Sequence, residues 1–165
     1  MKQYKRRTEN MGHMGSPSAA AIEGIFGETI DAMHMEFNCF SATAQGMLET
    51  GQTPQDNVRA FYRLTFRSVS SFVRALEEMS DASLQPRHRF VRAIFKTFLT
   101  QLELIKKAIE ELDEDSDVET HPACTTLAAG YLRFANAAHE CMIYTRKPHE
   151  CREIAESYEQ ATLEG

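Results

Sequence analysis

Residues 53–77 read TPQDNVRAFYRLTFRSVSSFVRALE, and this stretch predicts an amphipathic helix. Thr53, Pro54 and Asp56 give a cap, an early proline and a first-turn acid in the order that helix starts use. Apolar side chains then recur at the 3.6-residue spacing of one helix face. They are Phe61, Leu64, Val69, Phe72 and Leu76. The helix is expected to close in the polar segment 80–83, with one apolar face buried.

A helix is also predicted directly before this stretch. It begins after Ser16-Pro17-Ser18, and Gly51 ends it because glycine adopts the left-handed C-cap conformation without a steric penalty. Its apolar face carries Ile22, Phe26, Met33, Phe37, Phe40, Ala44 and Met47. Only a short turn separates Gly51 from Thr53, so the two helices are expected to be antiparallel neighbours.

Prolines mark the remaining helices as well. A third helix is expected to start near Pro86, a fourth at Thr120-His121-Pro122, and a short last helix over 149–162, after Pro148 breaks the fourth. The apolar rows are Phe90, Ile94, Phe98, Leu102, Ile105, Ile109 and Leu112 on the third helix and Leu127, Tyr131, Phe134, Ala138 and Met142 on the fourth. No strand-like alternation and no internal repeat competes with this pattern. The sequence predicts an all-α fold, an antiparallel up-and-down four-helix bundle with a short fifth C-terminal helix.

The composition fits one domain with a single core, since the 165 residues are 42% hydrophobic and 25% charged. We expect residues 17–165 to form this domain. Residues 1–16 are expected to be a flexible tail, part of which (11–16) resembles a cloning remnant. No apolar run is long enough for a membrane span or a secretory signal, so we expect a cytoplasmic protein with no membrane partner. The four sparse cysteines indicate reduced thiols.

The net charge of −6 is distributed unevenly along the chain. Residues 17–54 hold five acids and no base, residues 55–107 carry a net charge of +5, and residues 108–165 carry −9. The second and third helices therefore form a basic hairpin between acidic segments.

The basic side chains of this hairpin lie in two rows. They are Arg59, Arg63, Arg67 and Arg74 on the second helix and Arg89, Arg92 and Lys96 on the third. The first four lie within about 80° of one another at 100° per residue, opposite the buried phenylalanines. Antiparallel pairing is expected to bring Arg74 near Arg87 and Arg89. Because the planar guanidinium binds carboxylates and phosphates through two donors at once, the rows predict an anion-binding patch.

Two interpretations of these rows remain open. The side chains are either the ordinary solvated face of bundle helices, paired with neighbouring acids, or an interaction patch. A patch of this kind favours an acidic protein partner, or self-association as a homodimer against the acidic region of a second copy. Nucleic acid is less favoured, because the chain is acidic overall and lacks interleaved exposed aromatic residues. We therefore predict a non-enzymatic interaction or regulatory bundle.

Two groups of side chains have metal-ligand chemistry but the wrong spacing. The acidic run 110–119 has aspartates at 113, 115 and 117, yet it lacks the central glycine and distal glutamate of a calcium loop. The tripeptide His-Glu-Cys occurs at 139–141 and 149–151, but residues i and i+2 point about 200° apart on an unbroken helix. We therefore predict no metal and no cofactor, with Cys141 in the core and His149 at the surface.

The segment Arg133-Phe-Ala-Asn-Ala-Ala-His139 resembles the Arg-x(4–6)-His signature of HEPN ribonucleases, which are helical bundles that carry this pair late in the chain. The resemblance implies a metal-independent ribonuclease, in which Arg133 and His139 provide phosphate stabilisation and general-base catalysis for attack by the RNA 2′-hydroxyl. It covers seven residues, Phe134 stands where the family often has a polar residue, and residues 7–13 give a second match. A ribonuclease is therefore the alternative to the interaction bundle.

Overall fold

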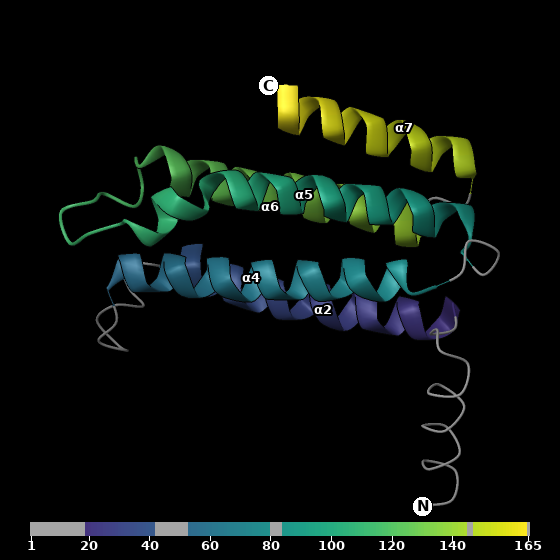
Figure 1. The fold of residues 1–165 in the computed structure, drawn as a ribbon, viewed down its shortest axis with the longest axis horizontal. Helices are drawn as coiled ribbons and strands as arrows, with labels where there is room; N and C mark the ends of the chain where they lie inside the picture. Colours follow the sequence, from purple (N-terminus) through teal and green to yellow (C-terminus); the bar gives the residue numbers. More distant parts are fainter. Residues whose placement is uncertain (1–18, 42–52, 80–83, 145–146, 165) are drawn as a thin grey trace, which may run out of the picture.

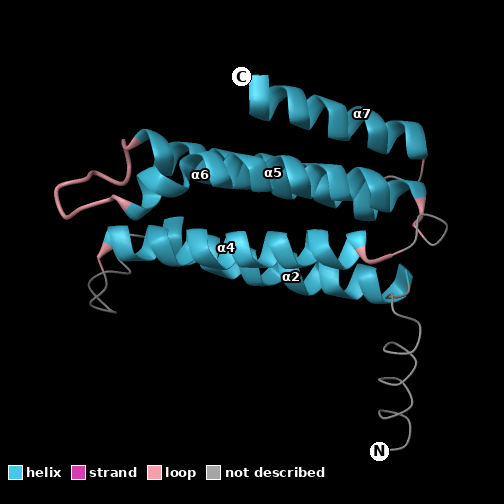
Figure 2. Ribbon diagram, in the orientation of Figure 1, coloured by secondary structure: helices cyan, strands magenta, loops and turns pink. Residues whose placement is uncertain are grey.

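The computed structural model describes residues 19–41, 53–79, 84–144 and 147–164, and its regular structure in these ranges is entirely helical (Figure 2). The five α-helices are α2 (Ala19–Ser41), α4 (Pro54–Glu77), α5 (Pro86–Glu110), α6 (Pro122–His139) and α7 (Pro148–Glu159). Two π-helical turns, η1 (Glu140–Tyr144) and η2 (Gln160–Glu164), continue α6 and α7. The described ranges contain no strand, and the prediction of an all-α fold is confirmed.

Helices α4, α5, α6 and α7 all begin with a proline, as the sequence indicates. Proline suits this position because the missing N–H would have no partner inside the helix. Side chains satisfy the next donors in two cases: Thr53 Oγ1 accepts a hydrogen bond from the Asp56 amide, and His121 Nδ1 accepts one from the Ala123 amide, both at 3.1 Å. The predicted helix end at Gly51 and the polar segment 80–83 lie outside the described residues.

Successive helices run in opposite directions, and they are stacked in layers (Figure 1). Helices α2 and α4 lie side by side at one side, α5 and α6 form the middle, and α7 covers the opposite side. Each of α2, α4, α5 and α6 packs against the next along the chain. This order of neighbours is consistent with an antiparallel four-helix bundle to which α7 is added as a short outer helix. Within the described ranges, no helix combines the length and apolar character needed to cross a bilayer.

An aromatic cluster joins four of these helices in the core. The ring centroids of Phe72 on α4 and Phe95 on α5 are 4.3 Å apart, and those of Phe95 and Phe134 on α6 are 4.7 Å apart. Phe26 on α2 completes the cluster, 5.9 Å from Phe72. All four side chains are fully or almost fully buried. Buried aromatic pairs contribute beyond the area that they remove from water, so this cluster fixes how the helices, and therefore their outer faces, are oriented.

Candidate partner-binding face

Three arginines of α4 lie on one outward face of the bundle. The buried side of α4 includes Phe61, Val69 and Leu76, whereas Arg63, Arg67 and Arg74 are exposed. At 100° per residue the three arginines fall within about 40° of one another. At 1.5 Å per residue, the distance along the helix from Arg63 to Arg74 is about 17 Å. We call these three residues the arginine face.

The arginine face is not neutralised by the described part of the chain. No ion pair or hydrogen bond joins the guanidinium of Arg63, Arg67 or Arg74 to any described residue. Of the exposed acids near these arginines in the sequence, Asp56 and Glu77 each pair with a different base. Glu78, the C-cap of α4 four residues after Arg74, forms no ion pair with a described residue. With respect to the described residues, the three side chains therefore keep all their donors for water or for a partner.

Arg59, predicted for the same row, is turned inward instead. Its Nη1 donates a hydrogen bond of 2.8 Å to the carbonyl of Leu112, beyond the end of α5, and its Nη2 lies 2.8 Å from Asp56 Oδ1. The bond from Arg59 is the first cause of a lowered pKa for the Asp56 carboxyl, with Thr53 contributing. Arg59 thus ties the start of α4 to the loop after α5, and its charge is already compensated.

The basic row of α5 is also partly compensated. Lys96 Nζ lies 2.7 Å from Glu77 Oε1, and this bond, with the charges of Lys96 and Arg92, lowers the pKa of Glu77. Arg92 is half-buried and Arg89 is exposed. Basic side chains of α5 therefore add to the surface beside the arginine face, but Glu77 offsets part of their charge.

A groove of about 410 Å³ runs between α4 and α5 at the end of the arginine face. Its lining combines both signs of charge with a few apolar and hydroxyl groups. The lining residues are Ser70, Val73, Arg74, Glu77, Lys96, Leu99, Thr100 and Glu103. Arg74 belongs both to the arginine face and to this groove, so a partner held by the arginines would also meet the half-buried side chain of Leu99.

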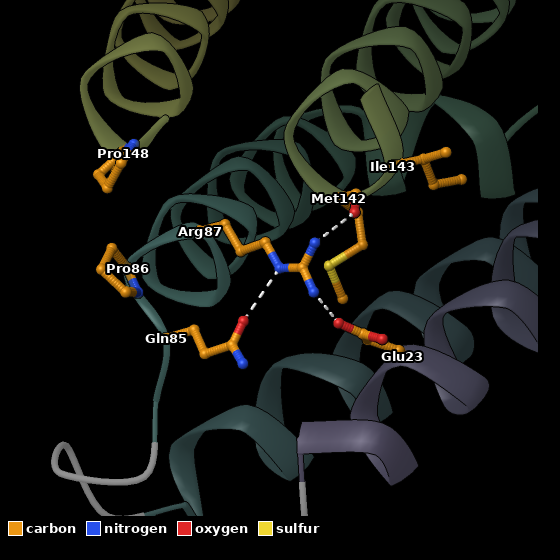
Figure 3. A pocket seen from close by; sticks show the side chains of 7 residues that line it. All are labelled: Glu23, Gln85, Pro86, Arg87, Met142, Ile143 and Pro148. Carbon is orange, nitrogen blue, oxygen red and sulfur yellow. Dashed lines mark hydrogen bonds and ion pairs between the residues drawn. The ribbon is translucent and has the colours of Figure 1, made fainter. Parts of the chain in front are cut away.

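Arg87 does not contribute to the basic hairpin surface, because its guanidinium is turned toward Glu23, Gln85 and Met142 (Figure 3). Its Nη2 pairs with the Glu23 carboxylate of α2, its Nη1 donates to the Met142 carbonyl of η1 at 3.1 Å, and its Nε donates to Gln85 Oε1 at 3.2 Å. These bonds lie beside a pocket of about 470 Å³ that Pro148 also lines. Arg87 therefore uses its donors to join α2, α5 and η1.

Arg133 and His139 lie in different surroundings on α6. Arg133 is exposed and lines an open groove of about 600 Å³ between α6 and α7, together with Glu150, Glu153 and Tyr158 among others. His139 does not line this groove; its half-buried ring is 5.7 Å from the ring of Phe26 on α2. Six residues of α-helix turn the two side chains about 120° apart, so the structure does not bring them together in one pocket.

The acidic loop between α5 and α6 uses its carboxylates to form turns. Asp113 Oδ1 accepts hydrogen bonds from the Asp115 amide at 3.0 Å and the Ser116 hydroxyl at 3.1 Å, and Asp117 Oδ1 accepts one from the Glu119 amide at 3.0 Å. Across the ranges that the structure describes, no three His, Cys, Asp or Glu side chains are grouped so that they could hold a metal ion.

The cysteines of the two His-Glu-Cys tripeptides contact each other, and the sequence did not predict this contact. Cys141 of η1 and Cys151 of α7 are both fully buried, and the thiol of each lies 3.5 Å from the main-chain carbonyl of the other. His149 is exposed at the start of α7. The identical tripeptides ten residues apart, on both sides of the helix break at Pro148, are the signal that could have indicated this contact.

No protein-family model, no curated protein and no solved structure matches this chain.

Proposed function

We propose that this protein is a non-enzymatic interaction bundle that binds an acidic protein partner through the arginine face of α4. The main support is that Arg63, Arg67 and Arg74 share one exposed face and make no ion pair with any described residue. Exposed guanidinium groups of this kind can each bind a carboxylate through two parallel hydrogen bonds.

The spacing of the three arginines favours a helical partner. Arg63 and Arg67 are four residues apart, and Arg67 and Arg74 are seven residues apart, which are close to one and two full helical turns. An acidic helix with carboxylates at the same intervals can align with all three arginines over about 17 Å. The proposed partner is therefore an acidic helix lying along α4.

The strength of such a contact is limited by solvent. An exposed ion pair contributes about 0.2–1 kcal/mol, so three pairs alone give a weak, salt-sensitive complex. The groove beside Arg74 supplies the half-buried Leu99 and the side-chain carbons of its polar lining as apolar contacts next to the charges. We propose that the charges set the orientation and speed of binding, while these apolar contacts add to its lifetime.

A second copy of the chain is one acidic partner that the structure offers. Helix α7 carries Glu153, Glu156 and Glu159 as exposed acids, and it lies on the opposite side of the molecule from α4 (Figure 1). These acids are three residues apart and span about 9 Å, so they can pair with only part of the arginine face. Contact between α4 of one copy and α7 of another would join unlike surfaces and extend head to tail. Self-association through this contact would therefore grow with protein concentration and weaken with salt.

A designed acidic peptide can take the place of the natural partner in a test of this proposal. The probe is a fluorescent alanine-based helix with glutamates at positions i, i+4 and i+11, and a peptide of equal composition with the glutamates spread around the helix is its control. We expect binding of the first peptide at low salt, weakened roughly tenfold or more by Arg63→Glu with Arg67→Glu. Anisotropy titration measures both affinities.

The matched control variant is Lys106→Glu with Lys107→Glu, because both lysines are exposed on α5 and the change in net charge is the same. This variant should bind the peptide nearly as the unmodified protein does. An equal loss of peptide affinity in the two variants, or equal affinity for the two peptides, would show that only net charge matters. Either result would refute a specific arginine face.

A further inference from the structure

Two buried thiols face one another where η1 and α7 meet. Cys141 Sγ lies 3.5 Å from the Cys151 carbonyl oxygen, and Cys151 Sγ lies 3.5 Å from the Cys141 carbonyl oxygen. Each thiol is also close enough to affect the pKa of the other. This reciprocal arrangement brings the two cysteines together, although nine residues separate them in the sequence.

Metal binding does not account for this pair. The described residues place no third His, Cys, Asp or Glu where it could share an ion with the two thiols. His149 is exposed at the start of α7, and the ring of His139 contacts Phe26. Two adjacent thiols without further ligands have one characteristic reaction, their oxidation to a disulfide.

We propose that Cys141 and Cys151 are a redox-active pair that forms a disulfide by exchange with a low-molecular-weight disulfide such as oxidised glutathione. The thiolate of one cysteine attacks a glutathione sulfur, forms a mixed disulfide and releases the first glutathione thiolate. The thiolate of the other cysteine then attacks the protein sulfur of the mixed disulfide and displaces the remaining glutathione as a thiolate. The two released thiolates take up the two protons lost by the cysteines, so the pair loses two electrons and glutathione disulfide gains them.

Burial controls when this reaction occurs. Burial is the first cause of the raised pKa of both thiols, to about 12 for Cys141, so both are protonated and shielded while α7 is docked. Helix α7 is the outer layer of the fold (Figure 1). The groove of about 600 Å³ is lined by residues of α6 and α7. Separation of α7 from the bundle would expose both cysteines together and return their pKa values to the ordinary range.

The disulfide would in turn fix α7 in place. Bridging Cys141 and Cys151 closes a loop of about ten residues, for which chain-entropy models give roughly a hundredfold bias toward the closed arrangement. Oxidation is therefore expected to slow hydrogen exchange of the α7 amides, while leaving α4 and α5 unchanged. The pair thus acts as a modification site that links the redox state to the docking of α7.

Peptide mapping of the complete protein detects the bond directly. After incubation in a glutathione redox buffer and alkylation of remaining thiols, trypsin cuts after Arg133, Arg146 and Arg152, which separates Cys141 and Cys151 onto two peptides. We expect these peptides to remain joined until a reductant is added, and the α7 amides to exchange at least roughly tenfold more slowly in the oxidised protein. Alkylated Cys141 and Cys151, or glutathione adducts on each without a joined peptide, would overturn the proposal.

Two variants separate the pair from the other cysteines. The Cys39→Ser variant retains the pair and should give the same joined peptides, and Cys151→Ser should leave Cys141 alkylated or carrying glutathione. Should Cys151→Ser not fold, judged by circular dichroism, Cys124→Ser serves instead as a second pair-retaining variant, because Cys124 is a buried thiol of α6 outside the pair. Joined peptides linking Cys124 to Cys141 or Cys151 would overturn the assignment.

Discussion

The hydroxyl of Tyr62 on α4 donates a hydrogen bond of 2.7 Å to the main-chain carbonyl of Leu102 on α5. Tyr62 is almost fully buried, and burial together with the charges of Glu110 and Glu103 raises the pKa of its phenol to about 12. The phenol therefore stays protonated and acts as a donor at neutral pH. This bond joins α4 and α5, the two helices of the basic hairpin, on the buried side of α4.

Removing this hydroxyl should loosen the hairpin. Tyr62→Phe retains the ring and its stacking on Phe66, whose centroid is 6.0 Å away, but removes the donor. We expect the free energy of unfolding to fall by about 0.5–1.5 kcal/mol, the usual net contribution of one hydrogen bond. Urea denaturation measures this change. Stability equal to that of the unmodified protein would contradict a contribution of this bond to the hairpin.

Acid should destabilise the fold through His88. This side chain is fully buried, and its Nε2 lies 3.9 Å from Glu23 Oε1, but neither ring nitrogen forms a hydrogen bond with a described residue. Burial, followed by the charge of Arg87, lowers its pKa, against a smaller opposite effect of Glu23. The unfolded chain, in which the pKa of histidine is about 6.5, then binds a proton that the folded chain does not. Stability therefore rises with pH between the lowered pKa and about 6.5, and it is lost as pH falls through that window.

The replacement His88→Leu tests this pH dependence. We expect the decrease in Tm between pH 7.5 and pH 5.5, roughly the window around an ordinary histidine pKa, to be smaller in His88→Leu than in the unmodified protein. His149→Leu is the control, because His149 is exposed and should leave the pH dependence unchanged. The same decrease in all three proteins would assign the acid sensitivity to other groups.

Ribonuclease activity that depends on Arg133 and His139 is not expected from their positions. Arg133 lines the groove between α6 and α7, whereas His139 contacts Phe26 of α2. A catalytic pair of this kind must reach the same phosphodiester. We expect no cleavage of a fluorescent RNA by the purified protein; cleavage lost in both His139→Ala and Arg133→Ala, with the fold retained, would instead establish the ribonuclease alternative.

The helix starts could be predicted from the sequence because they depend on local chemistry. Pro54, Pro86, Pro122 and Pro148 each occupy the first turn of a helix, where a missing N–H has no cost. The buried aromatic residues could be predicted for a similar reason, since their spacing follows the helix period. Both features depend only on residues that are close together in the sequence.

The partners of long side chains could not be predicted in the same way. Arg87 pairs with Glu23, which lies 64 residues earlier, and Arg59 reaches the carbonyl of Leu112, 53 residues later. A helical wheel places an arginine on a face, but a flexible side chain can bend to an acceptor on another element. Of the predicted row on α4, only Arg63, Arg67 and Arg74 are exposed without a partner among the described residues.

The cysteine contact depends on the helix break between the two tripeptides. In an uninterrupted helix, Cys141 and Cys151 would be about 15 Å apart along the axis. The π-helical turn η1 and the new start at Pro148 reverse the chain, so that α7 returns along the bundle and the thiols meet. Periodicity alone does not indicate the direction that a chain takes after a break.

A reversal of charge on both sides of the contact tests the arginine face most directly. The variant Arg63→Glu with Arg67→Glu is titrated with two helical peptides that differ only in carrying glutamate or lysine at positions i and i+4, and both keep glutamate at i+11 opposite Arg74. We predict that the variant no longer binds the glutamate peptide and binds the lysine peptide instead. The control Lys106→Glu with Lys107→Glu should still prefer the glutamate peptide, as the unmodified protein does. A variant that binds neither peptide, or a control that switches preference as well, would contradict partner binding at Arg63, Arg67 and Arg74.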